Sequence, residues 1–349
     1  MANPEKHAAP PALSSASAEP IYVGSDAFRY RVEVGWGQLP KGWSFVEVVA
    51  VATDTVGHVF VFNRGEHPVV VFDRQGKFQR SWGEGLFVRP HGILIGPDDA
   101  VYCVDDSDHT VRKFTPSGEL LLTLGSSGKY ANTGAVTVDY RTILRSGPPF
   151  NFPTNVALSP SGEIVVADGY GNARVHRFSP EGRLIASWGE PGAKAGQFHV
   201  PHGIAIDQSG TVYVADRENS RIQLFSPTGQ FLAEWTDVAR PCQVFIDRDG
   251  NVFVAELGYR AGMFPDNEPP PGHPTGGRMS VFNAQGELQA RWGGGDNPRA
   301  PGDFFAPHDV WVDDRGDVYV SEVTISAGGN RGLVARDCHT LQKFVRTPN

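Results

Sequence analysis

The chain of 349 residues is built from six copies of one repeat of roughly forty residues. In the clearest copy, residues 198–236, four short runs are separated by a D-x-x-G turn, a polar turn and a P-x-G turn. Four short strands joined by tight turns form one antiparallel sheet, which buries both faces only when neighbouring copies stack on it. The repeat therefore predicts an all-β fold, a six-bladed β-propeller.

The two ends of the chain are expected to meet in the sixth copy. This copy ends with the run at 341–345 and leaves little room for an outer strand, whereas a strand-like run, FRYRVEVGW at 28–36, precedes the first copy. Since an open ring would leave two unpaired sheet edges, we expect the N-terminal strand to complete the sixth blade. We predict one propeller domain at 23–349 after a disordered tail at 1–22.

The composition favours many turns and little helix, and it limits the classes of binding partner that we expect. The 41 Gly and 27 Pro are typical of tight turns between strands. A net charge of −8 without a basic run argues against nucleic acid and anionic membranes, so we expect a small-molecule or peptide-like substrate. A cytoplasmic protein is expected, because we find no membrane-spanning apolar run, no secretory leader and no disulfide pattern among three Cys.

Two stretches are longer than the repeat requires. Residues 126–149 lie between the second and third copies, and residues 258–277 lie between the second and third strands of the fifth copy. In an up-and-down blade these two kinds of connection emerge on the same face. We expect this face to carry the function, because long loops on a rigid scaffold usually bind ligands.

One position near the start of each innermost strand carries histidine in alternate copies. The six equivalent residues are Val49, His91, Thr154, His202, Cys242 and His308. Alternate blades of a six-fold ring are about a third of a turn apart, so the three histidines are expected to converge on one axial point. Three neutral imidazoles with a free coordination position are typical of a catalytic zinc site. Alternatively, P-H-G is a turn signature in which each histidine is structural.

A second equivalent position follows the second strand of each copy. It holds Arg64 in the first copy and Arg217 in the fourth, which lie across the channel from each other near the same face. Guanidinium groups beside a metal would suit a carboxylate or a developing oxyanion. Alternatively, the two arginines form salt bridges with acids such as Glu66 and Glu218.

These motifs resemble known families. The repeat resembles the NHL repeat, and the stretches FVRPHGI, DGYGNARVHRFSPEGRLIASWG, GQFHVPHGIAI, VADRENSRIQLF and FFAPHDV together resemble peptidylglycine α-amidating lyase, which completes the C-terminal amidation of peptides. The resemblance extends from about residue 48 to residue 345. It implies a six-bladed propeller with a catalytic zinc ion and a structural calcium ion in the channel.

The resemblance also implies a role for individual residues. It makes His91, His202 and His308 the zinc ligands, Tyr170 the catalytic tyrosine, and Arg64 and Arg217 the active-site arginines. It assigns calcium to the backbone carbonyls of Val51 and Ile93 and to the carboxylate of Asp309.

The sequence departs from that family in three respects. The positions of the family's two disulfides hold Asn151 with Gly171 and Tyr213 with Leu224, which agrees with a cytoplasmic location. Ala306 replaces a methionine beside the zinc. No copper monooxygenase domain is fused to the repeats, so a separate hydroxylating enzyme would act upstream.

Together these features predict a metal-dependent carbon–nitrogen lyase that cleaves a carbinolamide to an amide and an aldehyde or glyoxylate-like product. Zinc would acidify the substrate hydroxyl, Tyr170 would act as general base or proton shuttle, and an arginine would hold a carboxylate. Two alternatives stay open. One is a metal-dependent hydrolase of an ester, lactone or amide at the same channel site, and the other is a non-catalytic NHL scaffold that binds proteins.

Overall fold

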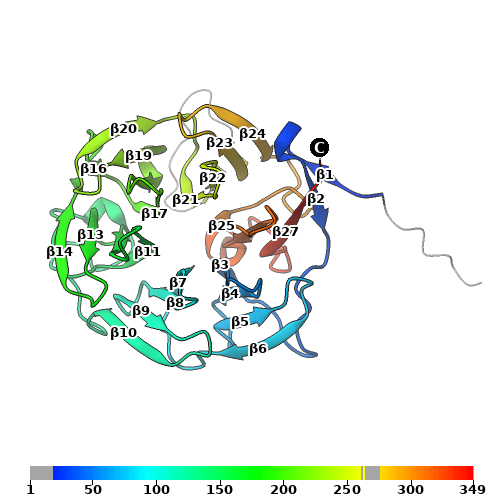
Figure 1. The fold of residues 1–349 in the computed structure, drawn as a ribbon, viewed down its shortest axis with the longest axis horizontal. Helices are drawn as coiled ribbons and strands as arrows, with labels where there is room; N and C mark the ends of the chain where they lie inside the picture. The colour runs from blue at the N-terminus through cyan, green and yellow to red at the C-terminus, as the bar shows by residue number, and fades with distance from the viewer. Residues whose placement is uncertain (1–18, 261, 264–275, 349) are drawn as a thin grey trace, which may run out of the picture.

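Six sheets are arranged radially around a central axis, with the chain passing from one to the next around the ring (Figure 1). The computed structural model describes residues 19–260, 262–263 and 276–348. The predicted six-bladed β-propeller is confirmed. Helix is scarce in the described part of the chain, as expected, and the longest helix there, α1 (Thr324–Ala327), has four residues.

Each blade runs from an innermost strand at the axis to an outer strand at the rim. The innermost strands are β3 (Val48–Thr53), β7 (Pro90–Ile95), β11 (Pro153–Leu158), β17 (Pro201–Ile206), β21 (Pro241–Ile246) and β25 (Pro307–Val312). The second strands are β4 (Val59–Asn63), β8 (Val101–Asp105), β12 (Ile164–Asp168), β18 (Val212–Asp216), β22 (Val252–Glu256) and β26 (Val318–Glu322). The third strands are β5 (Val69–Phe72), β9 (Thr110–Phe114), β13 (Arg174–Phe178), β19 (Arg221–Phe225), β23 (Arg278–Phe282) and β27 (Leu341–Arg346).

The outer strands of the first five blades are β6 (Phe78–Trp82), β10 (Leu120–Gly125), β14 (Leu184–Trp188), β20 (Phe231–Trp235) and β24 (Leu288–Gly293). Short elements outside the blades are β15 (Glu190–Pro191), β16 (Gln197–Phe198) and the 3₁₀ turns η1 (Asp26–Phe28), η2 (Tyr140–Thr142), η3 (Arg217–Asn219) and η4 (Gly329–Arg331).

The N-terminal strand closes the ring, as predicted. Strand β2 (Tyr30–Glu33) pairs antiparallel with β27, from Tyr30 opposite Arg346 to Glu33 opposite Lys343, and β1 (Tyr22–Val23) adds a fifth strand outside it. The sixth blade is therefore built from both ends of the chain. Most of the predicted tail, residues 1–18, lies outside the described residues, and the boundary at 23 stays a prediction.

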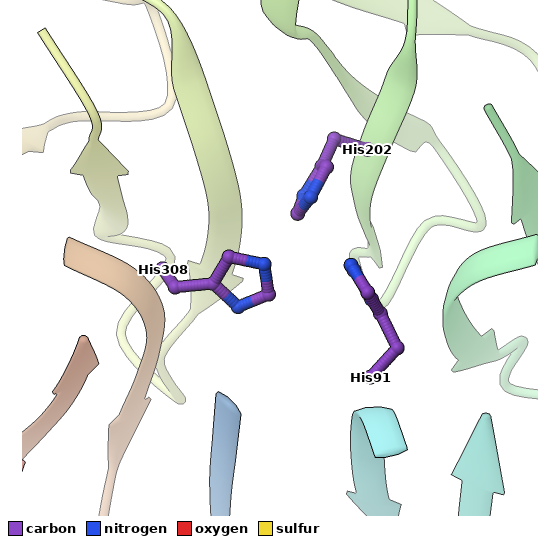
Figure 2. Close-up of side chains that lie close together, drawn as sticks. All are labelled: His91, His202 and His308. Atoms are coloured by element: carbon purple, nitrogen blue, oxygen red, sulfur yellow. The ribbon is translucent and has the colours of Figure 1, made fainter. Parts of the chain in front are cut away.

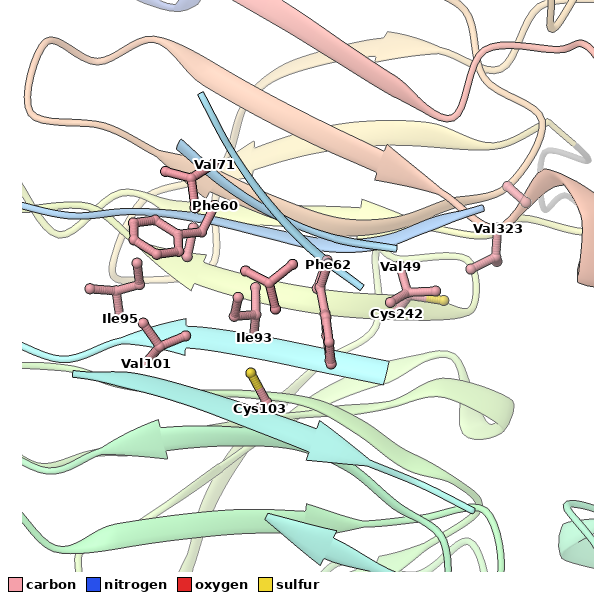
Figure 3. Packing of buried hydrophobic residues seen from close by; sticks show 14 of the residues in the cluster. Val49, Phe60, Phe62, Val71, Ile93, Ile95, Val101, Cys103, Cys242 and Val323 are labelled. Atoms are coloured by element: carbon pink, nitrogen blue, oxygen red, sulfur yellow. The ribbon is translucent and has the colours of Figure 1, made fainter. Parts of the chain in front are cut away.

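Strand β4 shows why the blades must stack. Phe60 and Phe62 point toward the second blade and pack with Ile93, Val101 and Cys103 (Figure 3). The alternate residues Val59 and Val61 pack on the other side, in a cluster that includes Tyr319 of the sixth blade. All five residues of β4 are buried, so both faces of this strand belong to the core. The propeller is thus a series of apolar layers between neighbouring sheets.

A polar side chain at the end of each second strand anchors the segment that leads into the innermost strand. The six residues are Asn63, Asp105, Asp168, Asp216, Glu256 and Glu322, all of them buried. Each accepts backbone N–H groups from that segment, as Asp105 does from Val88 at 2.6 Å and from Arg89 at 3.0 Å. These bonds satisfy buried polar groups and set where each innermost strand begins.

Three long connections emerge on the face where the innermost strands start, which we call the loop face. The predicted stretch 126–149 is one, and Asn151 anchors it by donating from Nδ2 to the carbonyls of Ala131 and Ala135. The predicted stretch 258–277 lies mostly outside the described residues. The third, residues 323–340 between β26 and β27, was missed by the sequence analysis, although its length between the two strands was visible; it contains α1 and η4.

Candidate metal centre

Three histidines from alternate blades face one another on the axis of the ring. Each is the second residue of its innermost strand: His91 on β7, His202 on β17 and His308 on β25. Their ring centroids are 4.8 to 4.9 Å apart, and one nitrogen of each lies within 4.8 Å of the others (Figure 2). The side chains are 1%, 1% and 5% exposed. The structure therefore brings together the three residues that the alternating pattern singled out.

The three imidazoles are held by the three non-histidine residues of the same ring of equivalent positions. Nδ1 of His91 lies 2.6 Å from the carbonyl oxygen of Thr154, Nδ1 of His202 lies 2.8 Å from that of Cys242, and Nδ1 of His308 lies 2.7 Å from that of Val49. A carbonyl only accepts, so each Nδ1 carries the proton and each Nε2 keeps its lone pair. Ligand and acceptor thus alternate around the axis, and the acceptor orients the ligand, as second-shell partners do in metal sites.

Glycine after the histidine permits this close approach in two blades. A Cβ on Gly203 would lie 2.5 Å from the carbonyl oxygen of Cys242, and a Cβ on Gly92 would lie 2.9 Å from that of Thr154. Both contacts are shorter than a methyl group tolerates. The P-H-G motif therefore serves the geometry of the histidines as well as the turn.

The electrostatics of the site favour neutral imidazoles. Burial lowers the pKa of all three histidines, and the guanidinium groups of nearby arginines, Arg64 among them, lower it further; the pKa of His308 falls to about 3. Neutral imidazole is the form that binds a metal. Three converging Nε2 lone pairs with fixed tautomers fit a divalent metal such as zinc, with a further coordination position free.

Tyr170 closes one side of the histidine group. Its hydroxyl lies 3.1 Å from Nε2 of His91 and 3.0 Å from Nε2 of His202, and the side chain is 8% exposed. Arg217 donates from Nη1 to the same hydroxyl at 3.3 Å. The predicted catalytic tyrosine and one predicted arginine are therefore in contact with each other beside the histidines.

Both predicted arginines have an acidic partner, and one partner differs from the expectation. Arg217 donates from Nε to Glu218 at 2.7 Å, as the salt-bridge alternative proposed. Arg64 pairs with Glu47 at 2.7 Å, so the expected pairing with Glu66 is wrong. Glu47 precedes the first innermost strand, and its backbone carbonyl accepts the N–H of Arg64 at 2.9 Å, which holds the two residues side by side, whereas Glu66 is exposed. Each arginine therefore forms a salt bridge and also faces the site.

A cavity of about 260 Å³ opens from the loop face onto this group. Besides Tyr170 and the two predicted arginines, its lining includes residues that the sequence analysis missed, namely Arg89, Val138, Ser326, Ala327 and Arg331. Ser326 is tied to the site because its N–H donates to Glu47 at 2.6 Å and its hydroxyl lies 3.3 Å from Nη1 of Arg64. The excess length of residues 323–340 is the pattern that could have revealed this wall of the cavity. A larger cavity of about 440 Å³ lies at the opposite ends of the innermost strands, away from the histidines.

The three residues expected to hold calcium lie deeper in the channel. Asp309 is buried, and it accepts from the N–H of Val51 at 2.9 Å and from Nε2 of Gln243 at 2.7 Å. Since N–H and C=O of one residue in an antiparallel strand point to the same side, the Val51 carbonyl also faces the channel, as does that of the equivalent residue Ile93. Burial raises the pKa of Asp309 to about 7. A buried carboxylate beside carbonyl oxygens fits a hard cation such as calcium.

Similarity to known proteins agrees with the fold. The NHL repeat family matches residues 150–178 and 198–225. Human NHL repeat-containing protein 3 is 28% identical over 201 residues, which cover 54% of each chain. Mouse peptidyl-glycine alpha-amidating monooxygenase is 32% identical over 209 residues, or 50% of this chain and 20% of that protein. Peptidyl-alpha-hydroxyglycine alpha-amidating lyase 1 of Drosophila melanogaster is 35% identical over 156 residues, or 41% of this chain and 26% of that protein. This chain therefore matches only part of each relative.

Solved structures show the same architecture at low sequence identity. A streptogramin B lyase superposes with a TM-score of 0.59 at 13% identity, covering 93% of this chain and all of that chain. A gluconolactonase from Xanthomonas campestris superposes with a TM-score of 0.60 at 12% identity, covering 95% and 96% of the two chains. Within the described residues, no helix has the length and apolar character needed to cross a bilayer. The chain is thus an NHL-repeat six-bladed propeller, distantly homologous to amidating lyase domains and to NHL repeat-containing protein 3.

Proposed function

We propose that the chain is a zinc-dependent carbon–nitrogen lyase that cleaves a carbinolamide to an amide and a glyoxylate-like aldehyde. The observation that carries the proposal is the tyrosine hydroxyl 3.0 to 3.1 Å from two neutral imidazole nitrogens, with Arg217 donating to the same oxygen. The distant homology to amidating lyases supports the same chemistry. A scaffold that only binds proteins has no need for this arrangement at the bottom of a cavity.

The residues divide the reaction among them. His91, His202 and His308 would hold the metal, which when bound would supply Lewis acidity at the carbinol oxygen. Tyr170 takes the proton of the carbinol hydroxyl and returns it to the amide nitrogen as the C–N bond breaks, so the reaction consumes no water. Arg217 donates to the hydroxyl oxygen of this tyrosine at 3.3 Å and so helps to orient it in the site.

The arginines also orient the substrate. Arg64 is fixed by Glu47 and Ser326, and within the described residues its Nη2 donates to no acceptor, so this nitrogen is available to bind the carboxylate on the reacting carbon. The cavity of about 260 Å³ favours a small or peptide-like substrate that enters end first. A separate hydroxylating enzyme would supply the carbinolamide, and we expect both proteins in the cytoplasm.

The second cation is part of the same proposal. Calcium bound by Asp309 and by the carbonyls of Val51 and Ile93 would tie three innermost strands together. We expect calcium to raise the thermal midpoint of the native chain. The Asp309→Asn variant should show no such increase. An equal calcium response in the variant would remove the calcium assignment and leave the histidine site unaffected.

The lyase proposal is tested with N-benzoyl-α-hydroxyglycine and metal analysis. We expect about one zinc per native chain, loss of zinc and turnover in His202→Ala, and retention of zinc with turnover about 10²-fold or more slower in Tyr170→Phe. His58→Gln, on a turn remote from the site, is the matched control and should behave as the native chain. Native turnover by Tyr170→Phe would contradict the proposed proton transfer.

Product analysis in ¹⁸O-water separates the lyase from the hydrolase alternative. Hydrolysis of an ester, lactone or amide places solvent oxygen in the acyl product, whereas the lyase reaction leaves the acyl oxygen unlabelled. A labelled acyl product would replace the lyase by the hydrolase. A chain that neither binds metal nor turns over substrate would favour the protein-binding scaffold.

A further inference from the structure

Arg89 stands beside the metal centre without a part in the proposed reaction. It lies two residues before His91, its backbone N–H is held by Asp105 at 3.0 Å, and its side chain lines the cavity. The Arg89 side chain is 31% exposed and bonds through Nη1 to Asp106, whose side chain is fully buried. Asp106 occupies in the second blade the position that Arg64 and Arg217 occupy in theirs. The Arg89–Asp106 pair thus adds a third arginine to the ring around the site.

The guanidinium of Arg89 is only partly used by the protein. An arginine has five N–H donors, and within the described residues Asp106 is the acceptor for Nη1 while Nε and Nη2 have no acceptor. Both nitrogens are accessible to solvent: neither is among the fully buried side-chain nitrogens and oxygens that lack a hydrogen-bond partner in the described part of the chain. Arg89 therefore presents open donors to the cavity from a carboxylate-anchored position.

The cavity lining is strongly one-sided in charge. Four of its residues are arginines, Arg64, Arg89, Arg217 and Arg331, and none of the described residues that line it is acidic. The acidic partners of Arg64, Arg89 and Arg217 do not line the cavity, so the charged side chains that a ligand meets among the described residues are cationic. This contrasts with the net charge of −8 of the whole chain. More guanidinium groups face the cavity than a single carboxylate can use.

We propose that the ligand of this cavity carries a second anionic group on its acyl side and that Arg89 binds it. This inference rests on the proposed function, in which the carboxylate on the reacting carbon uses Arg64. The substrate class is then an N-acyl α-hydroxyglycine with an acidic acyl chain, either a carboxylate or a phosphonate-like group, since both match the planar donor edge of a guanidinium.

The test is calorimetric binding to the metal-loaded full chain, with ligands that lack the carbinol hydroxyl and cannot react. The probes are N-succinylglycine, N-(3-phosphonopropionyl)glycine and N-levulinylglycine, whose terminal acetyl group is a neutral counterpart of the carboxylate. We expect at least one anionic probe to bind about tenfold tighter than the neutral one, because a charge-assisted hydrogen bond is lost in the latter. The preferred anionic probe then tells carboxylate from phosphonate.

The variants assign the preference to Arg89. In Arg89→Gln the ratio between the anionic and neutral probes should fall to within about threefold. The double variant Arg89→Gln with Asp106→Asn should give the same result, and it leaves no unpaired buried carboxylate that could disturb the fold. Arg183→Gln, an exposed arginine on the third blade, is the matched control and should keep the native ratio.

Three outcomes would overturn the inference: equal binding of all three probes by the native chain, no binding of any probe, or an undiminished ratio in both Arg89 variants. The lyase proposal is tested separately with the hydroxylated counterparts of the probes. If the binding ratio holds and no carbinolamide is turned over, the lyase proposal fails and the anion site of Arg89 stands.

Discussion

The contact between Glu47 and Arg64 gives the sharpest prediction about the site. The pair is nearly buried, with side chains 3% and 12% exposed, and its N–O distance is 2.7 Å. Glu47→Gln removes a charge-assisted hydrogen bond, which contributes about 1.5–3 kcal/mol. Arg64 would keep its bonds to the carbonyl of Pro90 at 3.0 Å and to Ser326 at 3.3 Å. We therefore expect a loss of about 2 kcal/mol rather than the roughly 3–5 kcal/mol of an orphaned buried charge.

A double-mutant cycle with Glu47→Gln and Arg64→Met measures this contact. Urea unfolding should give a coupling free energy of about 1.5–2 kcal/mol, and the thermal midpoint of Glu47→Gln should fall by about 3 °C for a domain of about 300 residues. Zinc content should not change, because neither side chain contacts the histidines. The exposed pair Arg299 and Asp337, at 54% and 74% exposure, is the control and should couple by less than about 0.5 kcal/mol. A coupling for Glu47 and Arg64 as small as this control would refute the reasoning.

Further predictions concern metal affinity and pH. Gly203→Ala should weaken zinc binding, because its Cβ displaces the Cys242 carbonyl that orients His202. Competition with a chromophoric chelator measures the zinc affinity. The control Gly147→Ala, whose Cβ would lie in open space, should bind zinc as the native chain does. Chelation should lower the thermal midpoint, since metal at about 100 times its Kd stabilises the folded ring by about 2.7 kcal/mol, and an unchanged midpoint would argue against a metal. Burial lowers the pKa of His339, but the Glu322 carboxylate raises it more, so the pKa is raised overall. This histidine should stabilise the fold fully below about pH 6.5 and lose that effect as the pH rises through its folded pKa, and stability curves of His339→Gln should lack this decline.

The blades and the histidine positions could be predicted because the information is local. Each copy repeats its own turn residues and its own alternation of apolar side chains, and a repeated unit that cannot bury its faces alone can only stack. Once six copies are aligned, the ring symmetry converts the alternation of His91, His202 and His308 with other residues into one axial site. Arg64 and Arg217 came from a second equivalent position of the repeat, whereas Tyr170 came from a resemblance over short motifs, and the structure places these side chains around the same cavity.

The sequence could not predict contacts between residues that come together only when the blades pack against one another in the ring. The acceptor for His308 is the carbonyl of Val49, 259 residues earlier, and the acceptor for His202 belongs to the next blade. Arg64 lies 262 residues from Ser326, which shares its partner Glu47. No local pattern encodes such pairs, because they depend on how neighbouring blades are set against one another. The sequence alone thus determined a six-bladed ring with three axial histidines. The tertiary structure decided the tautomers of these histidines, because their acceptors are carbonyls of adjacent blades. It also decided the cationic lining of the cavity, because side chains from several blades meet there.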